Sequence, residues 1–97
     1  MINIEPFSDL IFVHMAGCEA CEAAMPELTE FENANPRLMV VKVRADGSMV
    51  DRLVGKKIRA TPTYVFRYAG NGFFHEGMMT AKQLGSWIDS ILKREAE

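Results

Sequence analysis

The residues best suited to chemistry in this chain are its two cysteines, Cys18 and Cys21, which are separated by Glu19 and Ala20. A disulfide between them would close a loop too short to constrain the unfolded chain, so the pair is not a structural staple. Two thiols at this spacing can instead exchange with other disulfides or bind a metal ion. The spacing by itself leaves both functions open.

Redox exchange and metal binding make different demands on the rest of the chain. A closed zinc site usually takes four ligands, and the sequence has no second C-x-x-C. Metal binding would therefore need His14, or a second copy of the chain that shares an ion or an iron–sulfur cluster. A third alternative is a redox-silent adaptor that uses its surface to bind partners. Metal retained through purification would favour metal binding, and partner binding that survives Cys18→Ser would favour the adaptor.

Two predicted elements position the cysteines. Residues 10–13 form a continuous apolar run, which predicts a strand buried on both faces. Residues 19–33 show three- and four-residue apolar spacing, which predicts a helix with Cys21 on its buried face. Pro26 is expected to kink this helix because it lacks a backbone donor. Cys18 would then lie at a helix N-terminus, where unpaired N–H groups and the helix dipole stabilise a thiolate.

The rest of the chain alternates between strand and helix patterns. Thr80 and Gln83 form a capping box that begins the last helix, which ends near Arg94. The order predicts an α/β three-layer sandwich: a four-stranded mixed sheet, βαβ then ββα, flanked by helices on both faces. The other predicted elements are a strand at 38–43, a turn at 46–48, a short helix at 49–54, a strand at 63–66, a hairpin tip at 70–72 and a strand at 73–75.

Length and charge narrow the functional classes. At 97 residues the chain is predicted to form one domain, residues 1–97. Its 11 basic and 13 acidic residues give a net charge of -2, which argues against non-specific nucleic-acid binding. No apolar run approaches the roughly 18 residues that span a membrane, and residues 1–10 lack the basic start of a secretory signal. We therefore expect a cytoplasmic monomer with no nucleic-acid or membrane partner, in which a lone C-x-x-C stays reduced.

Several motifs, at their spacing, resemble the thioredoxin family from about residue 10 to residue 92. The C-x-x-C opens a helix, and Pro26 follows Cys21 by five residues, where thioredoxins carry a helix-kinking proline. Residues 58–63 look like the segment that holds the family's cis-proline. The remaining matches are residues 40–46, the turn at 70–72, and Gly77 before the last helix.

The resemblance implies a thiol–disulfide oxidoreductase that reduces protein disulfides. In this mechanism Cys18 attacks the target disulfide and Cys21 resolves the mixed disulfide. The resemblance implies no cofactor beyond the redox-active Cys18–Cys21 disulfide. The implied partners are disulfide-containing protein substrates, with a reductase or glutathione as electron donor. The resemblance also implies a cis peptide bond before Pro62. The substrate-binding residues that it implies are Thr61, Pro62, Gly17 and Gly77.

The chain departs from the family pattern at three places. Glu19-Ala20 stands between the cysteines where Gly-Pro is familiar, and Gly17 stands where a tryptophan often precedes the first cysteine. Phe12 occupies the place of a buried aspartate that assists proton transfer in many members. The short N-terminus makes the chain similar to the small, glutaredoxin-sized form of the fold. These departures affect the expected substrate, reduction potential and reductase partner more than the expected class of reaction.

Three residues near the cysteines are predicted to modulate them. Glu19 and Glu22 place negative charge beside the thiolate, which should raise the pKa of Cys18 and make the protein more reducing. The alternative is that they are solvated helix-start residues with little effect. His14, at the end of the first strand, could transfer protons, although a partly buried structural histidine is the more common case.

The methionines and the second histidine receive simpler predictions. We expect Met25 and Met39 in the core and His75 on the surface. Met15, Met78 and Met79 could line a soft substrate groove, but ordinary packing is the favoured role for most of them.

Overall fold

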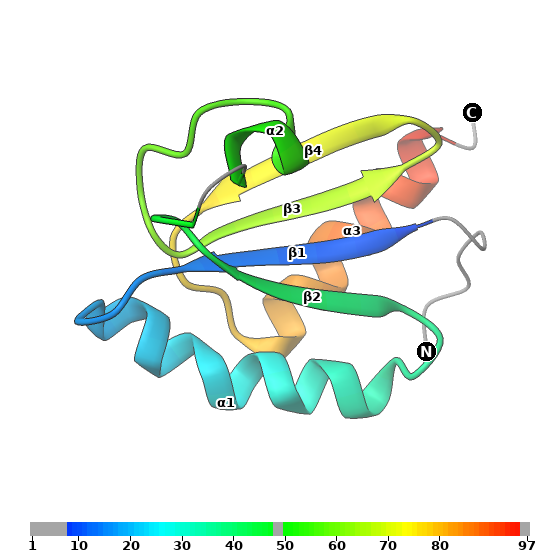
Figure 1. The fold of residues 1–97 in the computed structure, drawn as a ribbon. Coiled ribbons are helices and arrows are strands. Elements are labelled where there is room, and N and C mark those ends of the chain that lie inside the picture. Colours follow the sequence, from blue (N-terminus) through cyan, green and yellow to red (C-terminus); the bar gives the residue numbers. More distant parts are fainter. Residues whose placement is uncertain (1–7, 48–49, 96–97) are drawn as a thin grey trace.

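The computed structural model describes residues 8–47 and 50–95 of the chain. Ser48 and Met49, in the predicted turn and at the start of the predicted second helix, lie outside these residues. The elements alternate as the sequence predicts, with small differences at their ends. In chain order they are β1 (Asp9–His14), α1 (Glu19–Ala34), β2 (Met39–Arg44), α2 (Val50–Val54), β3 (Thr63–Tyr68), β4 (Asn71–Glu76) and α3 (Ala81–Glu95) (Figure 1).

The four strands form one mixed sheet in the order β2-β1-β3-β4. Strand β1 pairs in parallel with β2 and antiparallel with β3, and β3 forms an antiparallel hairpin with β4. In this register Phe12 lies between Lys42 on one side and Tyr64 on the other. The predicted parallel first pair and antiparallel last pair are therefore confirmed, and β1 and β3 are the two inner strands.

Helices cover both faces of the sheet, which confirms the predicted three-layer sandwich (Figure 1). Helices α1 and α3 lie on one face, where Leu28 and Ile88 pack with Phe12 and Tyr64. Helix α2 lies on the other face, where Val54 packs with inward side chains of β1 and β3. Within the described residues, none of the helices has the length and apolar character to cross a membrane.

Burial along β1 explains why its four central residues are all apolar. Leu10, Ile11, Phe12 and Val13 are all fully buried, because alternate side chains enter the two cores on opposite faces. Strand β2 is at the sheet edge and is much more exposed. The expectation that Met39 lies in the core is wrong, since 64% of it is exposed.

Helix α1 runs from the cysteine pair along the whole sheet and continues through Pro26. Helix α3 begins with the predicted capping box: the Thr80 hydroxyl accepts from the Gln83 amide at 3.1 Å, and the Thr80 amide donates to the Gln83 side chain at 2.9 Å. Two orphan N–H groups at the helix start are thereby satisfied.

Candidate active site

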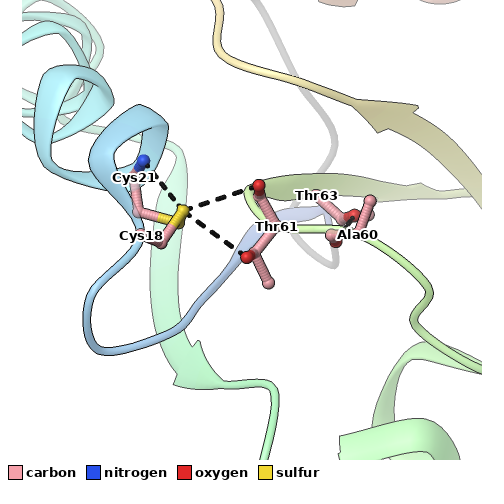
Figure 2. The surroundings of a disulfide bond; sticks show 5 residues. All are labelled: Cys18, Cys21, Ala60, Thr61 and Thr63. Atoms are coloured by element: carbon pink, nitrogen blue, oxygen red, sulfur yellow. Dashed lines mark hydrogen bonds between the residues drawn. A yellow bond between two sulfur atoms is a disulfide. The ribbon is translucent and has the colours of Figure 1, made fainter.

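The end of β1 and the first turn of α1 place Cys18 opposite the loop that leads into β3 (Figure 2). Cys18 is the N-cap residue of α1, with extended backbone angles of φ -93° and ψ 104°. Its Sγ accepts a hydrogen bond from the Cys21 amide at 3.1 Å. A side-chain acceptor at this position satisfies one of the free donors of the helix, and those donors stabilise negative charge on the sulfur.

Cys18 and Cys21 form a disulfide, with their Cα atoms 5.2 Å apart. The two sulfurs belong to residues of different exposure. Cys21 lies on the buried face of α1 and is 3% exposed, whereas Cys18 is only partly buried. Cys18 is therefore the sulfur that an incoming molecule can reach.

Thr61 approaches the sulfur of Cys18 from the other side of the site (Figure 2). Its carbonyl oxygen lies 3.5 Å from Cys18 Sγ, and its hydroxyl donates toward the same atom at 3.5 Å. The Thr61–Pro62 peptide bond is cis. A hydroxyl donor beside the sulfur adds to the helix N-terminus as a second group that favours a thiolate.

A short segment that leads into α3, residues 77–81, is bonded to the Pro62 loop and is called the wall segment below. The Gly77 amide donates to the Pro62 carbonyl at 2.8 Å. The Met79 amide donates to the Tyr64 hydroxyl at 3.1 Å, in a buried position. The Ala81 amide donates to Glu27 Oε1 on α1 at 2.8 Å.

These bonds connect the wall segment to three other parts of the fold. Gly77 adopts a φ of 103°, a conformation that favours glycine, and this lets the chain turn toward Pro62. Burial raises the pKa of the Tyr64 phenol above its usual value, an effect that the Met79 hydrogen bond partly opposes. The phenol therefore stays neutral at ordinary pH and remains an acceptor for the Met79 amide.

The arrangement of sheet, helices and cysteine pair is similar to several solved thioredoxin structures. Chloroplastic thioredoxin z matches with a TM-score of 0.75 at 22% identity, over 91% of this chain and 80% of the other. Fasciola hepatica thioredoxin matches with a TM-score of 0.74 at 18% identity, over 89% and 82%. Mitochondrial thioredoxin 3 from Saccharomyces cerevisiae matches with a TM-score of 0.72 at 24% identity, over 86% and 77%.

The chain has the thioredoxin fold. No protein-family model matches its sequence, and no curated protein does. The fold likeness therefore comes from structure at low sequence identity. It leaves the activity to be argued from the site itself.

On this thioredoxin fold, the other predicted site residues surround the sulfurs at different depths. Gly17 is exposed, with a φ of 74°, and forms the bend before Cys18. Glu19 and Glu22 are both exposed in the first turn of α1. His14 is partly buried, and its ring stacks on Phe12 with centroids 5.8 Å apart. Among the described residues, no three His, Cys, Asp or Glu side chains gather into a group that could bind a metal ion.

The methionines divide between the site and the core. Met15 is 36% exposed and lines a pocket beside Thr61, whereas Met79 is buried. His75, which was expected on the surface, is partly exposed. Its ring is partly buried between Tyr64 and Trp87, with centroid distances of 6.2 Å and 5.9 Å.

Sequence reasoning missed three residues that shape the site. Glu27 supports the start of α3, Tyr64 supports the wall segment, and Arg59 lines the pocket beside Thr61. Arg59 lies within residues 58–63, the segment that resembles the cis-proline loop. The sequence therefore indicates that this segment belongs to the site, but it does not single out Arg59. Glu27 and Tyr64 fitted ordinary helix and strand patterns, which gave no separate signal.

Proposed function

We propose that this chain is a thiol–disulfide oxidoreductase that reduces disulfides in proteins through Cys18 and Cys21. The observation that supports this most directly is the asymmetry of the pair. Cys18 is reachable, caps a helix and contacts Thr61, while Cys21 is buried one turn further along the same helix. Two sulfurs at this separation can form and break a disulfide with little movement of the helix.

The reaction starts from the reduced dithiol. The Cys18 thiolate attacks one sulfur of the target disulfide, the target S–S bond breaks, and one target sulfur leaves as a thiolate. Cys21 then loses its proton and attacks the Cys18 sulfur. The mixed disulfide breaks and the second target sulfur leaves. Two electrons have passed to the target, and the Cys18–Cys21 disulfide remains.

Two parts of the site assist these steps. The Cys21 amide and the Thr61 hydroxyl both contact Cys18 Sγ and stabilise it as a thiolate attacker and as a leaving group. Thr61 lies beside the sulfur, on the loop whose Pro62 carbonyl accepts from the Gly77 amide, and the Thr61 backbone is offered to an extended target chain. Gly17 and Gly77 border this surface, and we assign Thr61, Pro62, Gly17 and Gly77 to substrate binding.

The cycle needs a source of electrons. A reductase or glutathione would reduce the Cys18–Cys21 disulfide again, and no cofactor other than this disulfide takes part. We assign the protein to the cytoplasm, where a reducing thiol pool would keep the pair active. The similar thioredoxins include chloroplastic and mitochondrial proteins, so they favour no single compartment.

An assay of catalysed reduction and a trapping experiment test this proposal together. With a disulfide-bridged protein such as insulin, the wild-type chain should catalyse reduction by dithiothreitol, and Cys18→Ser should abolish it. Cys21→Ser should accumulate a mixed disulfide through Cys18, visible as a mass adduct that reductant removes. If Cys21→Ser traps nothing and the wild type reduces nothing, the proposal fails.

Equilibration with a dithiol buffer measures the reduction potential of the pair. A value near or below about -250 mV agrees with a reductant. A value near about -120 to -180 mV indicates an oxidase or isomerase and contradicts both the direction and the compartment proposed here. Glu19→Gln and Glu22→Gln provide a matched comparison, because a role for these charges predicts a potential that becomes less reducing in both variants.

A further inference from the structure

A pocket of about 250 Å³ opens beside the disulfide and shares Thr61 with it. Since the carbonyl and the hydroxyl of Thr61 both lie 3.5 Å from Cys18 Sγ, a residue of the pocket lining contacts the reactive sulfur directly. A side chain that neighbours an attacked cysteine would therefore be placed at the mouth of the pocket. The lining residues are Met15, Ala45, Ile58, Arg59, Ala60 and Thr61.

Most of this lining is apolar. Ile58 and Ala45 pack against the core between the sheet and α2, so this wall is fixed by the fold. Met15 is exposed enough to contact a bound side chain of the target, and its own side chain is flexible and polarizable. An aliphatic side chain would gain from leaving water here, whereas a polar one would gain nothing comparable.

Arg59 gives the pocket a charge. Its side chain is 73% exposed, and its ion pair with Glu76 has a long separation of 4.0 Å between Nε and Oε2. Lys57, two residues earlier on the same loop, is also exposed. On the other side of Cys18, the first turn of α1 carries the exposed carboxylates of Glu19 and Glu22. The two sides of the reactive sulfur therefore have opposite charge.

We propose that this pocket selects target proteins in which the attacked cysteine is followed or preceded by an apolar residue and then by an acidic residue. The apolar side chain occupies the pocket, and the carboxylate pairs with the Arg59 guanidinium in place of the weak contact with Glu76. A basic residue at the acidic position is repelled by Arg59. This inference rests on the proposed function and adds a choice of substrate to it.

Peptide disulfides test the selection directly. Each peptide carries one cysteine in mixed disulfide with 5-thio-2-nitrobenzoate, so release of the coloured thiol by the reduced chain gives the rate. The flanking residues are Leu-Asp, Leu-Lys or Ser-Asp, made in both sequence directions. The wild type should reduce the Leu-Asp peptide about fivefold faster than the Leu-Lys peptide in at least one direction, the size expected for exposed charges. In 1 M salt, where charges are screened beyond about 3 Å, this preference should largely disappear.

Two variants and one control separate the contributions. Arg59→Glu should reverse the preference between Asp and Lys. Arg37→Glu makes the same change of charge on an exposed residue beyond the far end of α1, about 24 Å from its first turn, and should leave the preference as it is. Ala60→Leu partly fills the pocket and should remove the preference for Leu over Ser.

The outcomes distinguish this inference from the proposed function. If the wild type reduces none of the peptides, the proposed function fails. If it reduces all of them at equal rates, or if Arg59→Glu and Arg37→Glu act alike, the selection is refuted while the reductase function stands. The reduction of glutathione disulfide is measured as well. If Arg59→Glu slows that reduction as much as it slows reduction of the Leu-Asp peptide, and Ala60→Leu changes neither rate, the occupant is a small anion and the inference is wrong.

Discussion

The buried hydroxyl of Tyr64 supports the wall segment, and Tyr64→Phe removes it with little change of shape. Tyr64 is fully buried and Met79 is 4% exposed, so the hydrogen bond that the Met79 amide donates at 3.1 Å is buried. A buried N–H left without a partner costs about 1–3 kcal/mol. We expect the free energy of unfolding to fall by about 2 kcal/mol. For a domain of this size this lowers the melting temperature by about 8–16 °C.

The same variant has a defined pH dependence. Burial raises the pKa of Tyr64 above the usual value of 10.0, so above pH 10 the folded protein holds a proton that the unfolded chain has lost. The stability that this group contributes is complete below pH 10 and is lost as the pH rises through the folded pKa. The difference in stability between wild type and Tyr64→Phe should therefore shrink between pH 8 and pH 11.

Urea unfolding at pH 8 and pH 11, followed by circular dichroism, measures both effects. Tyr68→Phe is the matched control, since Tyr68 is on the same strand but only partly buried, and we expect a change within about 0.5 kcal/mol. Hydrogen exchange at the Met79 amide should quicken in Tyr64→Phe alone. Equal stability of the two variants, or a difference that grows with pH, would refute the role assigned to this hydroxyl.

Two further predictions concern backbone and core. Gly85→Ala should stabilise the protein by about 1 kcal/mol, because Gly85 is within α3 and an added Cβ would meet nothing within 4 Å. Gly77→Ala should destabilise the protein, because Gly77 has a φ of 103°. The reverse ranking of the two variants in urea unfolding would contradict this. Ile88→Ala should cost about 2–5 kcal/mol because Ile88 is fully buried, while Leu53→Ala, at a residue 41% exposed, should cost far less. Similar urea midpoints for the last two variants would show that the core between sheet and helices is not where we place it.

Elements with strong local patterns could be predicted from the sequence. Residues 10–13 of β1 are all apolar because β1 is an inner strand covered on both faces, and the capping box at Thr80 forms the reciprocal bonds that its residues predict. The prediction that Met39 is buried failed because the exposure of Met39 depends on the position of β2 at the sheet edge, which strand order decides. His75 is only partly exposed because its ring contacts Trp87 of α3, and this contact depends on how distant elements pack.

The candidate site divides in the same way. The cysteine pair and the Thr61–Pro62 loop could be found because motif and spacing are local properties of the sequence. Glu27 and Tyr64 could not, since each acts on a residue that only folding brings near: Glu27 and Ala81 are 54 positions apart. The role that we propose for Arg59 depends on the pocket that it lines, and a pocket has no signature in the sequence.

The wall segment has a consequence for how the site forms in time. Its bonds reach back 15 residues to Pro62 and to Tyr64, and 54 residues to Glu27, so they form only after the hairpin and α1 have come together. The two cysteines need only the first turn of α1 to be adjacent. On the proposed function, a nascent or locally opened chain would therefore exchange disulfides before Gly77 and the Pro62 loop, which we assign to substrate binding, are held together. If the proposed function holds, the reactive thiol forms earlier in folding than the substrate-binding surface beside it.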